Sequence, residues 1–281
     1  MFCKNDWIYS NYKEKIKNPE LDLLLSTNLK NTLVKKMSFE EACDYTAIQI
    51  KNDHHKKIHI CFSGGIDSEK VVRVFHRNKI DFVPLIVLCD NNFEETKNAF
   101  DVCLELNLNP LILTMHENDL NAVVFLEILG TLKSNNMFCA PEIFACKNVT
   151  TDRGIIVDGG EPLDCLDVIK NTKFGLAQGD AYAYCLYTEK SIAVPFFYYT
   201  PEIFYSYVDN VDLSSEDNVQ LFKSKLYGLK YRPKYRPKYP QKIDRLIQWK
   251  AKENEKISKN YFVFGGKTQT LNMFRDHVEK F

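Results

Sequence analysis

The sequence lacks the long apolar segments that mark membrane and secreted proteins. No run of about 18 consecutive apolar residues occurs, so no membrane-spanning helix is expected. Residues 1–6 lack the apolar centre of a signal peptide. Basic and acidic residues number 37 each, so the net charge of zero gives no indication of bulk nucleic-acid binding. We therefore expect a cytoplasmic protein that makes no contact with a membrane.

Several motifs of cofactor and nucleotide sites are also missing. The nine cysteines include no Cys-x-x-Cys pair, the usual spacing of zinc and iron–sulfur sites. Their odd number and scattered positions indicate reduced thiols rather than a disulfide framework. No Gly-x-x-x-x-Gly-Lys-Ser/Thr sequence occurs, and no Gly-x-Gly-x-x-Gly follows an apolar run. These absences exclude the two commoner nucleotide-binding loops.

The most informative segment is Ser-Gly-Gly-Ile-Asp-Ser at residues 63–68. An apolar run at 58–62 predicts a strand before it, and Val71 to Phe75 predict the apolar stripe of a helix after it. The free N–H groups and the positive dipole end of a helix N-terminus favour an anion. Two glycines let the backbone approach phosphate oxygens closely, and the two serines add hydroxyl donors. The segment therefore predicts a pyrophosphate site.

Asp67 is an unusual acid within a phosphate site. A carboxylate beside phosphate is understandable if it holds a magnesium ion that bridges the phosphates, because hard cations take oxygen ligands. The alternative interpretation is an ordinary acid in the first turn of a helix, which the helix dipole also favours. We expect Asp67→Ala to abolish turnover and to leave the fold intact.

The fixed positions of this segment all match the Ser-Gly-Gly-x-Asp-Ser motif of the PP-loop ATP pyrophosphatases, which the chain therefore resembles. The resemblance implies cleavage of ATP between its α- and β-phosphates, with magnesium, and use of the AMP to activate a carboxylate or carbonyl oxygen. Asp67 is then both a catalytic residue and a magnesium ligand. The implied ATP contacts in the loop are Ser63, Gly64, Gly65, Ile66, Asp67 and Ser68.

Later features resemble, in their order, the synthetase domain of asparagine synthetases and β-lactam synthetases. A predicted strand at 82–89 ends where that family binds adenosine, which makes Leu88 and Asp90 candidate ATP contacts. An Ala-Val-Pro-Phe segment at 193–196 is similar to one that packs below the active site of the family. The resemblance covers roughly residues 38–245, closely at the loop and loosely elsewhere. It implies an AMP-forming ligase that joins a small-molecule carboxylate to an amine.

A second acidic segment follows a predicted strand at 155–158. In the resembled family, a strand at this point ends in glycines and an acid that shares the magnesium with the loop aspartate. Here Gly159 and Gly160 become candidate ATP contacts. The order of the acids differs from the family pattern, so three alternatives for the second magnesium ligand stay open: Asp158, Glu161 and Asp164.

Glutamine-dependent members of that family carry an amino-terminal glutaminase domain. The residues before the strand at 58–62 are too few for such a domain. We therefore expect the nucleophile to be an amine substrate, free ammonia, or ammonia supplied by a partner protein.

A basic segment at 231–240 contains Tyr-Arg-Pro-Lys twice, followed by Tyr-Pro. Proline at this spacing forbids a regular helix and favours an extended chain. Three interpretations stay open. The segment is a connector, or it carries Lys234 or Lys238 to the phosphates as catalytic lysines, or it is an arm that binds RNA through basic and aromatic side chains.

The alternation of short apolar runs with helical patterns between 58 and 158 predicts an α/β fold. We expect a mostly parallel sheet with helices on both faces, like the adenine nucleotide α-hydrolases. The predicted parts are a helical N-terminal segment at 1–55, the ATP-binding domain at 56–222, and a basic, helical or irregular extension at 223–281 packed on the same domain. Two other functions remain alternatives: an RNA-modifying enzyme of the PP-loop type, and a nucleotide-binding module without chemistry.

Overall fold

A sheet of five parallel strands forms the centre of the protein. The computed structural model describes residues 8–10, 25–27, 34–89, 92–132, 139–160, 169–170, 173–174, 179–210 and 219–232. The order of the strands in the sheet is β5-β4-β3-β6-β9. Their bounds are β3 Ile58–Cys61, β4 Val83–Leu88, β5 Leu111–Thr114, β6 Ile155–Asp158 and β9 Ala193–Pro195. Strands β3, β4 and β6 lie within the predicted strands at 58–62, 82–89 and 155–158.

The strand order reverses next to β3. Strands β4 and β5 are added in sequence on one side of β3, and β6 and β9 on the other. Register is set by parallel pairs such as His59 with Val83 and His59 with Ile156. In an open α/β sheet, ligands bind in the crevice at the carboxyl ends of the strands where the order reverses. Here the order reverses between β3 and β6, so a ligand is expected at their carboxyl ends.

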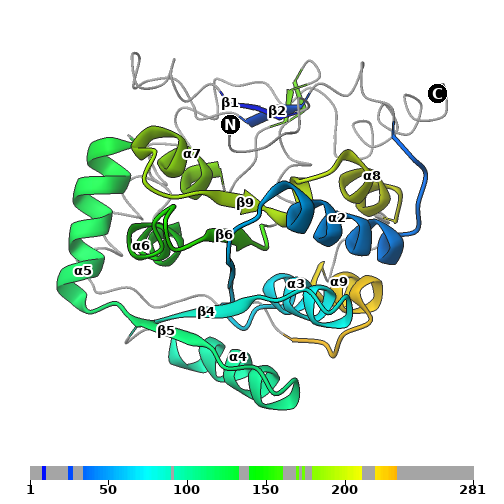
Figure 1. The fold of residues 1–281 in the computed structure, drawn as a ribbon, viewed down its shortest axis with the longest axis horizontal. Coiled ribbons are helices and arrows are strands. Elements are labelled where there is room, and N and C mark those ends of the chain that lie inside the picture. Colours follow the sequence, from blue (N-terminus) through cyan, green and yellow to red (C-terminus); the bar gives the residue numbers. More distant parts are fainter. Residues whose placement is uncertain are drawn as a thin grey trace.

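Helices cover both faces of the sheet, as predicted (Figure 1). The helices packed with one face are α2 Phe39–Asp53, α3 Ile66–Arg77, α4 Phe93–Glu105, α8 Pro201–Asn210 and α9 Val219–Tyr227. The short 3-10 helix η5 Phe196–Tyr198 lies with them. The helices of the other face are α5 Glu117–Ala122, the π-helix η2 Val123–Thr131, α6 Ala140–Asn148 and α7 Gly179–Thr188.

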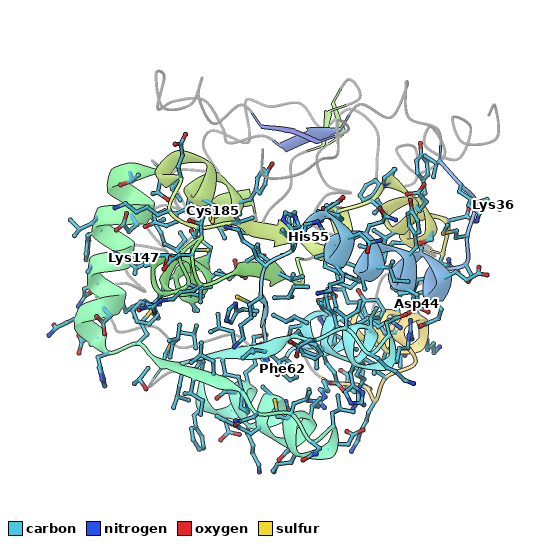
Figure 2. The ribbon with its side chains drawn as sticks, viewed as in Figure 1. Lys36, Asp44, His55, Phe62, Lys147 and Cys185 are labelled. Carbon is cyan, nitrogen blue, oxygen red and sulfur yellow. The ribbon has the colours of Figure 1, made fainter. Side chains whose placement is uncertain are left out.

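Two apolar cores follow from the alternation of side chains along the strands. Ile60, Ile86 and Val157 contribute to the core beneath α2, α3 and α8. Their neighbours Leu85 and Ile156 contribute to the core beneath α6 and α7. Figure 2 shows the two sides, with Asp44 on α2 at one and Lys147 and Cys185 on α6 and α7 at the other. Because β4 and β6 are buried on both faces, they are nearly continuous apolar runs, whereas β5 at the edge of the sheet is largely exposed.

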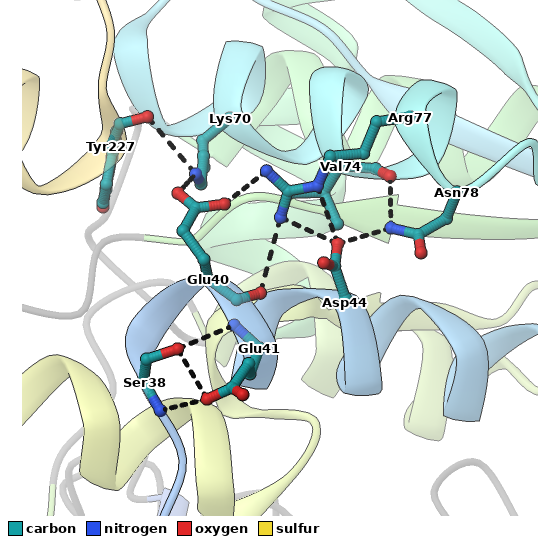
Figure 3. A network of polar contacts seen from close by, with 9 residues as sticks. All are labelled: Ser38, Glu40, Glu41, Asp44, Lys70, Val74, Arg77, Asn78 and Tyr227. Atoms are coloured by element: carbon teal, nitrogen blue, oxygen red, sulfur yellow. Dashed lines mark hydrogen bonds and ion pairs between the residues drawn. The ribbon is translucent and has the colours of Figure 1, made fainter.

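Polar contacts fix α2 against α3 (Figure 3). Helix α2 begins with a capping box, in which Ser38 Oγ accepts from the N–H of Glu41 and Glu41 Oε2 accepts from the N–H of Ser38 at 2.9 Å. In the same first turn, Glu40 pairs with Lys70 and Arg77 of α3. Lys70 Nζ also donates to the carbonyl oxygen of Tyr227 at 3.2 Å, which ties α9 to the same cluster. This network holds α3, and therefore the loop before it, in place.

The remaining described elements are short. Strand β1 Ile8–Ser10 pairs antiparallel with β2 Leu25–Thr27, and β7 Ile169–Lys170 pairs antiparallel with β8 Lys173–Phe174. The predicted helical segment at 1–55 thus contains the β1–β2 strand pair as well as α2. Helix α9 crosses the predicted boundary at 222/223. Among the described residues, no helix has the length and apolar character needed to cross a membrane.

Candidate active site

The segment at 63–68 lies at the switch point of the sheet, between β3 and α3. Helix α3 begins at Ile66 with Gly65 as its N-cap, so the cap has no side chain to occupy the first N–H groups of the helix. Ser63 Oγ accepts from the N–H of Gly65 at 3.2 Å, and Ser68 Oγ donates to the carbonyl oxygen of Gly65 at 3.0 Å. The serines thus shape the turn, and a helix N-terminus with open amides is what an anion requires.

Gly64 is required by both conformation and space. Its φ of +94° lies in the region that favours glycine, and a Cβ atom there would lie 2.0 Å from the carbonyl oxygen of Glu95. At Gly65 a Cβ atom would lie 3.3 Å from Glu95 Oε1 and from Ser63 Oγ, which are side-chain atoms. The loop is therefore packed directly against the first turn of α4, and the two glycines meet different constraints.

The turn after β6 lies beside the loop. A Cβ atom added to Gly159 would lie 3.2 Å from the backbone nitrogen of Ser68 and 3.4 Å from the carbonyl carbon of Asp67. Asp158, the last residue of β6, is buried and its Oδ1 accepts from the N–H of Gly160 at 3.2 Å. Burial, aided by the nearby charge of Asp67, raises the pKa of Asp158 to about 6. Two carboxyl groups thus meet at the switch point.

Helix α9 brings two polar side chains to Asp67. Lys223 Nζ donates to Asp67 Oδ2 at 2.7 Å, and the hydroxyl of Tyr227 donates to Asp67 Oδ1 at 2.7 Å. The two donors are four residues apart, so they share one face of the helix. The side chain of Lys223 is 0% exposed, whereas that of Asp67 is 21% exposed. Asp67 therefore lies at the mouth of the site, with a buried cation behind it.

Arg232 reaches the loop from the chain beyond α9. Its Nη2 lies 3.0 Å from Glu69 Oε2 on α3, and its Nη1 donates to the carbonyl oxygen of Gly64 at 3.5 Å. Glu69 also pairs with Arg73, whose guanidinium contacts Glu105 of α4. The beginning of the predicted basic segment thus lies against the loop.

The donors at this point fit a magnesium ion. Asp67 and Asp158 are carboxylates close enough for the charge of one to shift the pKa of the other, and a cation between them would relieve that repulsion. The described residues contain no cluster of three or more His, Cys, Asp or Glu side chains suited to a metal. Magnesium bound with a nucleotide needs no such cluster, because it takes one or two carboxylates together with phosphate oxygens and water.

The structure brings together the predicted residues from 63 to 68 with Asp158, Gly159 and Gly160. Leu88 ends β4, the strand next to β3, and is half-buried at the same carboxyl edge of the sheet. The other predicted site residues lie outside the described residues, so their assignments stay predictions: Asp90, Glu161, Asp164, Lys234 and Lys238.

Sequence reasoning missed the contacts from α4 and α9. Glu95 lies in the first turn of α4, but nothing in its sequence spacing marks it as a neighbour of the loop. Lys223 is one of 37 basic residues, and it reaches Asp67 across 156 positions of sequence. The only signal was the pairing of Lys223 with Tyr227 at a helical spacing of four. The sequence offered Lys234 or Lys238 as one of three interpretations of the basic segment, and both lie outside the described residues.

The chain matches no family model and no curated protein sequence. It is similar to solved structures. An NH3-dependent NAD synthetase from Campylobacter jejuni, in complex with nitrate, has 18% identity and a TM-score of 0.39, over 86% of this chain and 92% of that chain. NMN synthetase from Francisella tularensis has 13% identity and a TM-score of 0.37, over 76% of this chain and 93% of that chain.

A third similar structure is the U34-tRNA thiolase NcsA from Methanococcus maripaludis with its 4Fe-4S cluster. It has 12% identity and a TM-score of 0.41, over 86% of this chain and 80% of that chain. At these identities and TM-scores, the likenesses carry no argument about the reaction or the substrate. The functional interpretation depends on the loop and the residues around it.

Proposed function

We propose that the protein binds ATP over the loop at 63–68 and cleaves it between the α- and β-phosphates. The observation that carries this proposal is the arrangement at the switch point. A Ser-Gly-Gly-Ile-Asp-Ser turn opens the N-terminus of α3, and Asp67 and Asp158 lie together beside it. The amides would bind the β- and γ-phosphates, and the crevice beyond the end of β4 would receive the adenosine.

Asp67 and Asp158 would hold the magnesium ion, which supplies the positive charge that phosphate transfer requires. Both oxygens of Asp67 accept hydrogen bonds, from Lys223 and Tyr227, so α9 fixes the orientation of this carboxylate. Lys223 also offsets the negative charge that two carboxylates create beside a phosphate site. Positioning and charge compensation of this kind are the main means of catalysis in phosphate transfer.

The reaction we propose is adenylation. A carboxylate or carbonyl oxygen of the substrate attacks the α-phosphorus of ATP, the bond to the β-phosphate breaks, and pyrophosphate leaves. An amine or ammonia then displaces AMP from the activated carbon. In this form the protein is an asparagine synthetase-like ligase, a proposal supported by the match at the loop and by the second acid at Asp158.

A second candidate function is supported by Arg232. This residue leads into the Tyr-Arg-Pro-Lys repeat, and its guanidinium contacts the loop through Gly64 and Glu69. Arg232 at the loop, together with the basic and aromatic residues that follow it in the sequence, suits an RNA that presents a base carbonyl for adenylation. The activation chemistry is the same in this alternative, and only the acceptor differs.

The test is to incubate the protein with magnesium and α-labelled ATP and to resolve AMP from ADP. Fractions of a small-molecule extract and total RNA are added separately. AMP formation supports the proposed cleavage, and the fraction that stimulates it distinguishes a small-molecule acceptor from RNA. Formation of ADP contradicts the proposal. Tight ATP binding without any product would indicate a nucleotide-binding module.

A further inference from the structure

Glu95 is the acidic side chain of α4 that touches the phosphate loop. It lies in the first turn of the helix, half-buried, with its carbonyl oxygen against Gly64 and its Oε1 against Gly65. Its carboxyl group shares a hydrogen bond with Ser63. The neighbouring Glu94 is exposed. A carboxyl group beside Gly65 of a phosphate loop is unexpected, because an ionised carboxylate would repel the phosphates.

The hydrogen bonds of the loop connect Glu95 to the anion site. Ser63 Oγ contacts the Glu95 carboxyl group, accepts from the N–H of Gly65 at 3.2 Å, and lies 3.2 Å from Ser68 Oγ. An ionised Glu95 only accepts, so Ser63 must give its hydroxyl hydrogen to the carboxylate. A protonated Glu95 donates instead, and the hydroxyl hydrogen of Ser63 is then available for a phosphate oxygen.

The surroundings of Glu95 favour its protonated form. Burial raises the pKa of Glu95 to about 7, although the hydrogen bond with Ser63 acts in the opposite direction. Charged groups on the neighbouring elements are Asp67 and Glu69 of α3 and Arg232 beyond α9, and Arg232 is paired with Glu69. An anion bound at the loop would disfavour a second negative charge beside it.

We propose that Glu95 is a positioning residue of the loop that takes up one proton from solvent when the polyphosphate group of a nucleotide binds. The protonated carboxyl group then donates to Ser63 Oγ, and Ser63 donates to the phosphate. This inference rests on the proposed function, because it needs a nucleotide at residues 63–68. It adds a requirement that the motif itself does not contain, namely a neutral acid behind the loop.

The test is isothermal titration of the full chain with magnesium and α,β-methylene-ATP, whose bridging carbon blocks the proposed cleavage. Each titration is run between pH 6 and pH 8.5 in two buffers of different ionisation enthalpy, which gives the number of protons taken up. The variants are Glu95→Gln, which mimics the protonated carboxyl group, and Glu94→Gln as the matched control. Thermal melting checks that the variants are folded.

We expect the original protein and Glu94→Gln to take up close to one proton more than Glu95→Gln at pH 8. Their Kd should rise about 15-fold between pH 7 and pH 8.5, since the binding-competent protonated fraction falls by that factor. Protons on the nucleotide contribute equally to all three proteins and cancel in the comparison. Glu95→Gln should bind about tenfold more tightly than the original protein at pH 8, a gain that a merely structural role would not give.

Glu95→Ala provides a second measurement if Glu95→Gln is poorly folded, and it should remove the extra proton uptake as well. Equal proton uptake and equal pH profiles in the original protein and Glu95→Gln would overturn the role of Glu95 and leave the proposed function intact. No binding of the nucleotide by the original protein at any pH would overturn the proposed function, and this inference with it.

Discussion

The contact between Asp67 and Lys223 predicts an asymmetry between two substitutions. Lys223 is fully buried and Asp67 is one-fifth exposed, at 0% and 21%. Asp67→Asn removes the carboxylate from a buried ammonium, and breaking a buried pair in this way costs about 3–5 kcal/mol. Lys223→Met removes the buried cation itself and leaves a carboxylate that water reaches. We expect that variant to lose only about 1–2 kcal/mol, close to the cost of a hydrogen bond to a charged group.

The assay is urea unfolding of the original protein, the two single variants and the double variant. Asp67→Asn/Lys223→Met contains neither charge, so we expect it to be more stable than Asp67→Asn alone, with a coupling energy of about 1–3 kcal/mol. The m-value should not change, because the folded structure buries the same surface. Additive effects in the double variant, or a larger loss for Lys223→Met than for Asp67→Asn, would refute the reasoning.

The same contact changes one expectation from the sequence. Considered as a metal ligand alone, Asp67 was expected to tolerate substitution by Ala without effect on the fold. In the structure this carboxylate also accepts hydrogen bonds from Lys223 and Tyr227, which connect α9 to α3. We therefore expect Asp67→Ala to lower both activity and stability, and unfolding measurements must accompany any assay of that variant.

Two further predictions concern the loop and the second acid. Gly64→Ala should destabilise the fold by about 2 kcal/mol or more, because of its positive φ and the Glu95 carbonyl oxygen, whereas Gly65→Ala should change thermal melting little and weaken nucleotide binding. Similar melting temperatures for both variants would contradict this. The pKa of Asp158 is raised to about 6, so the stability that its protonation provides is present below pH 3.8 and is lost as the pH rises through 6. We expect the free energy of unfolding in urea to fall less between pH 4 and pH 7 for Asp158→Asn than for the original protein. The same fall in both proteins would contradict the assignment.

Much of the fold was predictable because the inner strands of the parallel sheet are buried and form short, mainly apolar runs. The runs at 58–62, 82–89 and 155–158 all became strands of one sheet. The apolar segment at 120–132 is helical, but the sequence does not indicate its π-helical hydrogen bonding. There the N–H of Leu132 donates to Glu127, five residues earlier. Apolar periodicity does not distinguish this spacing from an α-helix over so short a segment.

The candidate site was predictable only where chemistry is local in sequence. The loop carries its glycines, serines and acid within six residues, and the Asp-Gly-Gly turn follows its strand directly. Glu95, Lys223 and Tyr227 reach the loop through packing of α4 and α9, and their own neighbours in sequence do not mark them. Lys234 and Lys238 lie outside the described residues and stay predictions, and Lys223 is a buried lysine that the structure brings to Asp67.

The central claim is that the loop at 63–68 binds the phosphates of ATP. The most direct measurement is a crystal structure of the protein with magnesium and α,β-methylene-ATP. The account predicts β- and γ-phosphate oxygens within hydrogen-bonding distance of the backbone N–H groups from Gly64 to Ser68, with the metal between the phosphates and Asp67. Phosphates bound elsewhere, with those amides facing only water, would contradict it.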